Sequence, residues 1–205
     1  MYQSIIYRKE GAVAVVQINR PQKKNSLNTE LRHEMEAVLK EIANDRAIRA
    51  VVLTGGEEIF CAGADISEIE GTASAEDAYT HAREFQILFD QLETLPQPVV
   101  AAVSGYALGG GCELALACDL VVASTAARFA DTHARIGALP SWGLSQKLSR
   151  LIGPYRAKEL SLTGNLLSAD EAAAWGLVNR VVAPADLMPT CRALAADILR
   201  GVPQV

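Results

Sequence analysis

Short apolar segments that alternate with helical segments constrain the fold of this chain more than any other feature. Residues 50–54, 99–103 and 120–123 carry almost only apolar side chains, which is typical of strands that are covered on both faces. Longer segments with helical periodicity, residues 28–44 and 74–95, precede the first two of them. Strands that alternate with helices in this way predict an α/β fold built from repeated strand–strand–helix units.

The rest of the chain adds elements to the same pattern. At the N-terminus, alternating apolar and polar residues predict an antiparallel hairpin from residues 5–8 and 13–18. Towards the C-terminus, caps and apolar periodicity predict helices at residues 112–119, 145–151, 154–162, 168–175 and 185–200, and a strand at residues 178–182. No run of linker composition divides the 205 residues, so we expect a single domain over residues 1–205.

Composition and charge exclude several classes of protein. Half of the residues are apolar, which favours a folded core, and the net charge of −5 argues against a nucleic-acid partner. No apolar run is long enough to span a membrane, and residues 1–10 lack a basic start followed by an apolar block, so we expect no secretory signal. The four cysteines form no CxxC pair and are typical of buried side chains in a reducing compartment. We therefore expect a cytoplasmic protein.

Two glycine-rich turns stand out, because each follows a buried strand and leads into a helix. They cover residues 60–66 and 104–114, and neither is a nucleotide-binding loop: Leu114 occupies the position of the third glycine of a dinucleotide loop, and no Gly-Lys-Ser/Thr occurs. Small residues at a helix start let a ligand oxygen approach unpaired backbone N–H groups, so two such turns could form an oxyanion hole. The alternative is that the same glycines only permit tight turns and close packing of helices on the sheet.

Glu113 is the one charged residue of the second turn. It lies in a run of otherwise apolar residues, so we expect it to be at least partly buried. Such a carboxylate could be a general base whose basicity is raised by its surroundings. The alternative is a first-turn acid that complements the helix dipole.

At this point the residues resemble a known family. The segments FCAGADI (60–66), GYALGGGCELA (105–115) and CDL (118–120) are similar to motifs of the enoyl-CoA hydratase/isomerase (crotonase) superfamily. The similarity extends to RP (20–21), NSLN (25–28), LTG (162–164) and AAAWGLV (172–178). It therefore covers nearly the whole chain with its spacing intact.

The resemblance implies a crotonase-like spiral of strand–strand–helix units that acts on acyl-CoA thioesters. It implies homotrimers or dimers of trimers, no metal and no cofactor, since coenzyme A is part of the substrate. The two oxyanion N–H donors would be those of Ala62 and Gly110, and Glu113 would be the first catalytic carboxylate. The thioester would be bound by Ala62, Gly63, Ala64, Asp65, Ile66 and Gly110. We also expect that the chain lacks the C-terminal helices of the family.

The sequence departs from the family's pattern in two places. His133 stands where hydratases of the family have a second glutamate, and it could act as an acid or base near neutral pH or only fill the pocket wall. Asp131 is an alternative partner, since it shares a face with His133 if the stretch is extended. Trp142 lies in a loop that is usually richer in glycine, and it is either a packing residue or a wall of the acyl pocket that takes part in substrate binding. His81 is expected to have a surface or packing role on its helix.

The leading hypothesis is an enoyl-CoA hydratase, a carbon–oxygen lyase that adds water across the 2,3 double bond of an acyl-CoA thioester to give 3-hydroxyacyl-CoA. Glu113 would be the general base and His133 the candidate second group. One alternative is an enoyl-CoA isomerase or another enolate-type enzyme. The other is a non-catalytic protein that binds acyl-CoA.

Overall fold

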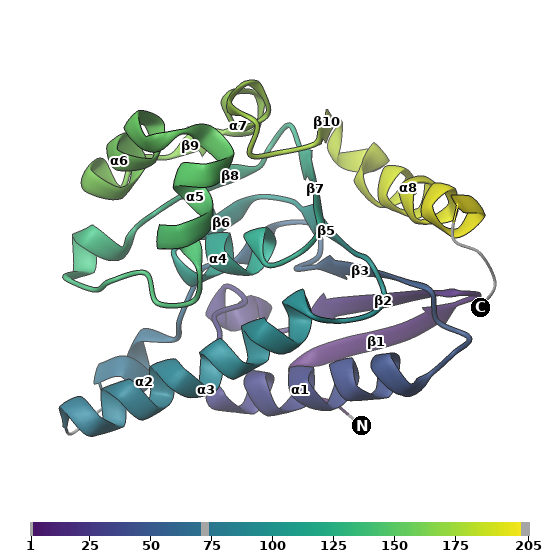
Figure 1. Cartoon of the computed structure of the whole chain (residues 1–205), viewed down its shortest axis with the longest axis horizontal. Helices are drawn as coiled ribbons and strands as arrows, with labels where there is room; N and C mark the ends of the chain where they lie inside the picture. The colour runs from purple at the N-terminus through teal and green to yellow at the C-terminus, as the bar shows by residue number, and fades with distance from the viewer. Residues whose placement is uncertain (1, 71–73, 202–205) are drawn as a thin grey trace.

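The computed structural model describes residues 2–70 and 74–201 and contains two β-sheets surrounded by helices (Figure 1). The larger sheet has the strand order β1-β2-β3-β5-β7-β10, in which β1 and β2 form the predicted antiparallel hairpin and the other pairs are parallel. Its strands are Ile5–Glu10 (β1), Val13–Ile18 (β2), Ala50–Thr54 (β3), Val99–Val103 (β5), Leu120–Ser124 (β7) and Arg180–Val182 (β10). The three strands predicted from their apolar composition, β3, β5 and β7, are therefore neighbours within this sheet.

A second, smaller sheet has the strand order β4-β6-β8-β9. Its strands are Ile59–Cys61 (β4), Tyr106–Leu108 (β6), Arg128–Ala130 (β8) and Leu167–Ser168 (β9). The first three are parallel to one another, and β9 is antiparallel to β8. These strands were not predicted from the sequence, because two or three residues are too few to show an alternating pattern.

The helices begin and end close to the positions predicted from the sequence, except for the short helix at residues 66–70, whose bounds were not predicted. They are Thr29–Asn44 (α1), Ile66–Glu70 (α2), Ala75–Glu93 (α3), Gly110–Leu116 (α4), Leu144–Ile152 (α5), Pro154–Thr163 (α6), Ala169–Trp175 (α7) and Leu187–Gly201 (α8). Short 3-10 turns occur at Pro21–Lys23, His133–Ile136 and Pro184–Asp186. Asn28 and Ser74 cap α1 and α3 with their side chains. The helix expected at residues 112–119 begins earlier, at Gly110, so the glycine run forms its first turn.

The six-stranded sheet is covered on both faces. On one face, Val52, Val100 and Val122 are fully buried in a cluster with Leu187 and Cys191 of α8 (Figure 1). The side chains of the opposite face pack in the main core with those of α1 and α3. This double burial explains the nearly continuous apolar sequence of β3 and β5 and confirms the predicted α/β class.

Two smaller expectations can be compared with the structure. All four cysteines are buried, as expected, and none of them forms a disulfide. Within residues 2–70 and 74–201, no helix combines the length and apolarity needed to cross a membrane.

Each strand–strand–helix unit sends its first strand to the large sheet and its second strand to the small sheet. Thus β3 is followed by β4 and α2, β5 by β6 and α4, and β7 by β8 and a 3-10 turn. Because β4, β6 and β8 are parallel, the residues that follow them leave the small sheet at the same edge. The turns that begin at positions 62, 109 and 131 are brought together there.

Candidate active site

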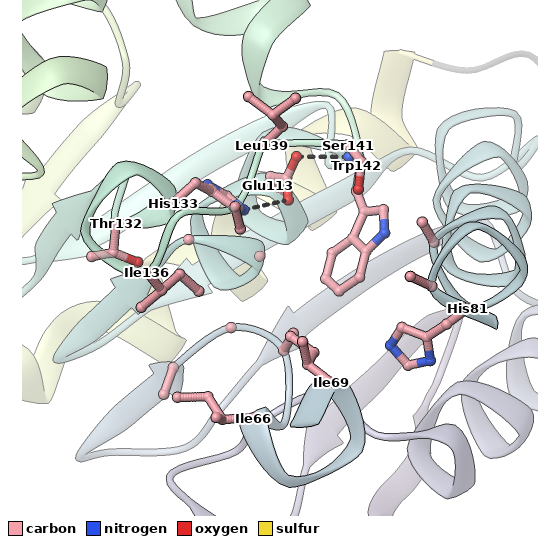
Figure 2. A pocket seen from close by; sticks show the side chains of 18 residues that line it. Ile66, Ile69, His81, Glu113, Thr132, His133, Ile136, Leu139, Ser141 and Trp142 are labelled. Carbon is pink, nitrogen blue, oxygen red and sulfur yellow. Dashed lines mark hydrogen bonds and ion pairs between the residues drawn. The ribbon is translucent and has the colours of Figure 1, made fainter. Parts of the chain in front are cut away.

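A cavity of about 330 Å³ opens at this edge of the small sheet (Figure 2). Its walls come from residues 62–69, helix α3, the first turn of α4 and residues 132–142. Exposed isoleucine side chains, Ile66 and Ile136 among them, lie at its rim. An apolar cavity that holds a few polar groups is typical of a small-molecule site.

Two backbone N–H groups meet at the cavity wall, but they are not the predicted pair. The N–H of Ala62 donates to the carbonyl oxygen of Lys24 at 3.1 Å, so the prediction that it is a free oxyanion donor is wrong. The N–H groups of Ala64 and Gly110 have no acceptor within the described part of the chain. They lie close together, since a Cβ added to Gly110 would be 3.4 Å from the nitrogen of Ala64, and one added to Gly63 would be 3.2 Å from the nitrogen of Gly110.

A long-range bridge explains why Ala64 and not Ala62 turns its N–H to the cavity. The N–H of Leu27 donates to the carbonyl of Gly63, and the N–H of Asp65 donates back to the carbonyl of Leu27, each at 2.8 Å. In an extended segment, successive N–H groups point to opposite sides. The N–H of Ala64 therefore points away from Leu27 and towards the start of α4.

Glu113 is 1% exposed, and its two carboxylate oxygens have different environments. Oε1 accepts hydrogen bonds from the backbone N–H groups of Trp142 at 2.8 Å and Leu144 at 3.2 Å. Oε2 has no hydrogen-bond partner among the described residues, and it lies 3.5 Å from Nε2 of His133, an ion-pair distance (Figure 2). One oxygen is thus fixed, and the other can accept a proton in the cavity.

His133 lies between two carboxylates. Its Nδ1 is 2.7 Å from Oδ1 of Asp131, and its Nε2 faces Glu113. Burial alone would lower the pKa of His133, but hydrogen bonding to Asp131 and the nearby carboxylate of Glu113 outweigh burial and raise it to about 9. Burial would raise the pKa of Asp131, but hydrogen bonding to His133 holds it below its usual value. The imidazole is therefore protonated at neutral pH, so that both ring nitrogens are donors.

The contact between Asp131 and His133 was an open alternative in the sequence, and the structure contains it. It does not arise from an extended stretch, because His133 begins a 3-10 turn. The backbone N–H of His133 also approaches Oδ1 of Asp131, at 3.3 Å. A tight turn therefore holds the two side chains together.

Comparisons with known proteins show to which family the chain belongs. The family model described as enoyl-CoA hydratase/isomerase matches residues 8–205. The chain belongs to the enoyl-CoA hydratase/isomerase family. It is 47% identical to the short-chain-enoyl-CoA hydratase of Clostridium acetobutylicum, over 98% of this chain and 77% of that protein. It is 41% identical to the crotonyl-CoA hydratase of Syntrophomonas wolfei, over 97% of this chain and 76% of that protein.

A solved structure agrees with these relatives. The crystal structure of an enoyl-CoA hydratase from Bacillus anthracis matches with a TM-score of 0.92 and 39% sequence identity, over 96% of this chain and 77% of that one. The predicted crotonase-type fold and the predicted hydratase-type enzyme are therefore confirmed.

Asp65 lies in the family's first glycine-rich turn but does not reach the cavity, contrary to the prediction that it binds substrate. It is 8% exposed, and Oδ2 accepts hydrogen bonds from Nη2 of Arg20 and Oγ of Ser26, each at 3.1 Å. Oδ1 accepts from Oγ of Ser67 at 2.7 Å. Burial would raise the pKa of Asp65, but these bonds hold it below its usual range. Asp65 therefore anchors the turn whose other residues line the cavity.

Trp142 is both a packing residue and a wall of the cavity. It is 8% exposed, and its ring stacks on that of Phe85 at 4.6 Å and contacts that of Phe89 at 5.5 Å. A Cβ added to Gly110 would lie 2.5 Å from Cζ3 of the indole, so the ring requires glycine at that position. The backbone of the same residue holds Oε1 of Glu113 in place.

The wall formed by α3 was missed from the sequence. His81, for which a surface or packing role was predicted, lines the cavity together with Ala78 and Ala82. The helix is tied to the opposite wall, because Nε2 of Gln86 donates to the carbonyl of Ser141 at 2.9 Å. No motif marks this wall in the sequence, because it exists only where α3 approaches residues 132–142.

Proposed function

We propose that this chain hydrates short 2-enoyl-CoA thioesters to 3-hydroxyacyl-CoA, with Glu113 as general base and protonated His133 as general acid. The observation that carries the proposal is the distance of 3.5 Å between Oε2 of Glu113 and Nε2 of His133, beside the free amides of Ala64 and Gly110. The aromatic wall at Trp142 and the names of the two relatives support a short acyl chain.

The amides of Ala64 and Gly110 activate the thioester. Its carbonyl oxygen accepts hydrogen bonds from both N–H groups, which draws electron density away from C3 of the enoyl group. The same bonds stabilise the negative charge that collects on this oxygen as the nucleophile adds. The amides are fixed by the backbone, so they need no reorganisation during the reaction.

Glu113 and His133 divide the proton transfers. Oε2 of Glu113 takes a proton from water while the water oxygen forms a bond to C3, and the π electrons move to the enolate. The N–H at Nε2 of His133 then gives its proton to C2, and the carbonyl re-forms. The proton held by Glu113 returns to His133, so that one water has been added and the enzyme is restored. Asp131 keeps the imidazole oriented throughout.

The test is the hydration of 2-butenoyl-CoA, followed by the loss of enoyl-thioester absorbance, with the product identified by mass spectrometry. In Glu113→Gln the carboxamide cannot accept the proton, and we expect kcat to fall by about 10³-fold with little change in KM. The matched control is Glu159→Gln, an exposed position on α6, which should leave both constants unchanged.

Three outcomes would contradict the proposal. Equal turnover by wild type and Glu113→Gln would remove Glu113 from the mechanism. Isomerisation of 3-butenoyl-CoA without hydration of 2-butenoyl-CoA would assign the alternative reaction. Tight binding of acyl-CoA without turnover at any chain length would assign a binding protein.

Two further parts of the proposal rest on the family resemblance. They are assembly into homotrimers or dimers of trimers, and a reaction that needs no metal and no cofactor beyond the coenzyme A of the substrate. A cytoplasmic location is a third part, and it rests on the four cysteines without a CxxC pair. Size-exclusion chromatography with light scattering tests the assembly. Assay after exhaustive treatment with chelators tests the requirement for a metal.

A further inference from the structure

The cavity contains two buried polar atoms that the hydration mechanism does not use. Among the described residues, six buried side-chain nitrogen or oxygen atoms have no hydrogen-bond partner. Three of these six belong to residues that line the cavity, namely Oε2 of Glu113, Nε2 of His81 and Nε1 of Trp142. Glu113 is the proposed base, whereas the two ring nitrogens remain without a role.

The two nitrogens belong to one part of the cavity. The ring of Trp142 stacks on Phe85 at 4.6 Å, and the ring of His81 contacts the same Phe85 at 5.0 Å. Figure 2 shows the nitrogen-bearing edge of the Trp142 indole on the side of α3, the helix that carries His81, and on the side away from His133. Ala78 and Ala82 have small side chains and form the adjoining wall.

Buried polar groups in folded proteins are nearly always paired, so unpaired ones on residues that line a cavity call for a partner, which a bound ligand can supply. The indole N–H of Trp142 is only a donor and needs an acceptor on the ligand. A histidine ring nitrogen donates or accepts according to its tautomer, so an oxygen on the ligand can supply a partner for His81 as well. No lysine or arginine lies among the residues that line the described cavity, and the protonated His133 lies on its other side. A neutral oxygen therefore fits this place better than a carboxylate.

We infer that the end of the cavity at α3 is a polar subsite, in which Trp142 and His81 bind a hydroxyl or carbonyl oxygen carried by the acyl chain of the substrate. The inference rests on the proposed function, because it takes the enoyl thioester to be bound with its carbonyl at Ala64 and Gly110. It narrows the substrate class to short enoyl thioesters whose acyl chain carries a neutral oxygen beyond the double bond.

The experiment compares 2-pentenoyl-CoA and 2-hexenoyl-CoA with the same thioesters that carry a terminal hydroxyl. The quantity is the ratio of kcat/KM, hydroxylated over plain, at each length. In wild type we expect a ratio of about tenfold or more at one of the two lengths. Trp142→Phe removes the N–H and keeps a stacking ring, and His81→Phe removes the imidazole. Both should move the ratio towards one, with a smaller change for the plain substrate.

Tyr79→Phe is the matched control, because it also removes a polar group from α3 but at a side chain that is 70% exposed. It should leave the ratio unchanged. Thermal unfolding and circular dichroism of each variant show whether it is folded, and a misfolded Trp142→Phe leaves His81→Phe to decide. A ratio near one in wild type at both lengths, or a ratio that neither variant lowers, would overturn the inference.

A second readout separates this inference from the proposed function. The dissociation constants of the saturated, unreactive 6-hydroxyhexanoyl-CoA and hexanoyl-CoA, measured by calorimetry, report the subsite without turnover. Tighter binding of the hydroxylated compound that is lost in His81→Phe would support the subsite even if no substrate were hydrated. Normal hydration of 2-butenoyl-CoA with no preference in either measurement would overturn the subsite alone.

Discussion

The six-stranded sheet and the four-stranded sheet of this chain differ in strand length, in burial and in their relation to the cavity. In the large sheet, every residue of β3 and β5 is buried, and none of its six strands contributes to the wall of the cavity described above. In the small sheet, β4, β6 and β8 each have three residues, and the turns that follow them supply Ala64, Gly110 and His133. Both sheets contribute to the core, since Phe60 of β4 and Phe129 of β8 are also buried, but the turns that supply the groups at the cavity follow the short strands. Substitutions should therefore separate stability from activity.

The largest loss of activity is expected for a substitution in the glycine run that follows β6 of the small sheet. In Gly110→Ala, the added Cβ would lie 2.5 Å from Cζ3 of Trp142 and would displace both the ring and the amide. We expect kcat/KM for 2-butenoyl-CoA to fall by about 10³-fold, because an oxyanion donor is misplaced. Gly201→Ala is the matched control, since a Cβ there meets nothing within 4 Å. Equal kcat/KM values for the two variants would argue against Gly110 as a donor.

In the large sheet, a substitution is expected to lower stability and to leave activity unchanged. Val52 is 0% exposed and lies on the face of the sheet that α8 covers, so Val52→Ala removes buried apolar volume. We expect the free energy of unfolding to fall by about 2 kcal/mol, measured by urea denaturation, with kcat/KM unchanged at 25 °C. A large loss of activity in the folded variant would show that the two sheets do not divide stability and catalysis as described.

A smaller effect is expected when the charge behind His133 is removed. Asp131→Asn keeps the shape of the side chain but loses the carboxylate that raises the pKa of His133 to about 9. Because protonated His133 is the proposed acid, activity is lost as pH rises through its pKa. We expect kcat to fall by about tenfold at pH 7.5 and the basic limb of the pH profile to move to lower pH. An unchanged basic limb would show that another group sets it.

The smallest effect concerns stability as a function of pH. His133 has an ordinary pKa of 6.5 and a folded pKa of about 9, so its contribution to stability is complete below 6.5 and is lost as pH rises through 9. After allowance for solvent screening, the contribution is on the order of 1 kcal/mol, or about 3 °C in Tm for a chain of this length. Thermal unfolding of wild type should show this decline between pH 7 and 10, and His133→Gln should lack it. The same slope in both proteins would contradict the assigned pKa.

The elements that could be predicted from the sequence are those in which one pattern of apolar and polar residues continues over a whole strand or helix. The buried strands β3 and β5 and the capped helix α1 were found because five to sixteen residues repeat one pattern. The small sheet was missed because its strands are shorter than any such pattern.

The sequence singled out Glu113 and His133 because their residue types can carry acid–base chemistry, and the structure places both at the cavity. The direction of a backbone N–H is different, because the bridge between Leu27 and Ala64 decides it, and a bridge between distant segments leaves no local signal. Asp65 was misassigned for a similar reason, since its partner Arg20 lies 45 positions away. His81 was missed because α3 meets its opposite wall only in the folded chain.

The unequal environments of the two oxygens of Glu113 have a stereochemical consequence. Trp142 and Leu144 hold Oε1, so that only Oε2 faces the substrate, and it does so from the same wall as His133. A planar enoyl group beside this wall presents one of its two faces to both groups. In the proposed mechanism the hydroxyl and the new hydrogen arrive on that face, so we expect a product with a single configuration at C3 and, in deuterated water, a single configuration at C2.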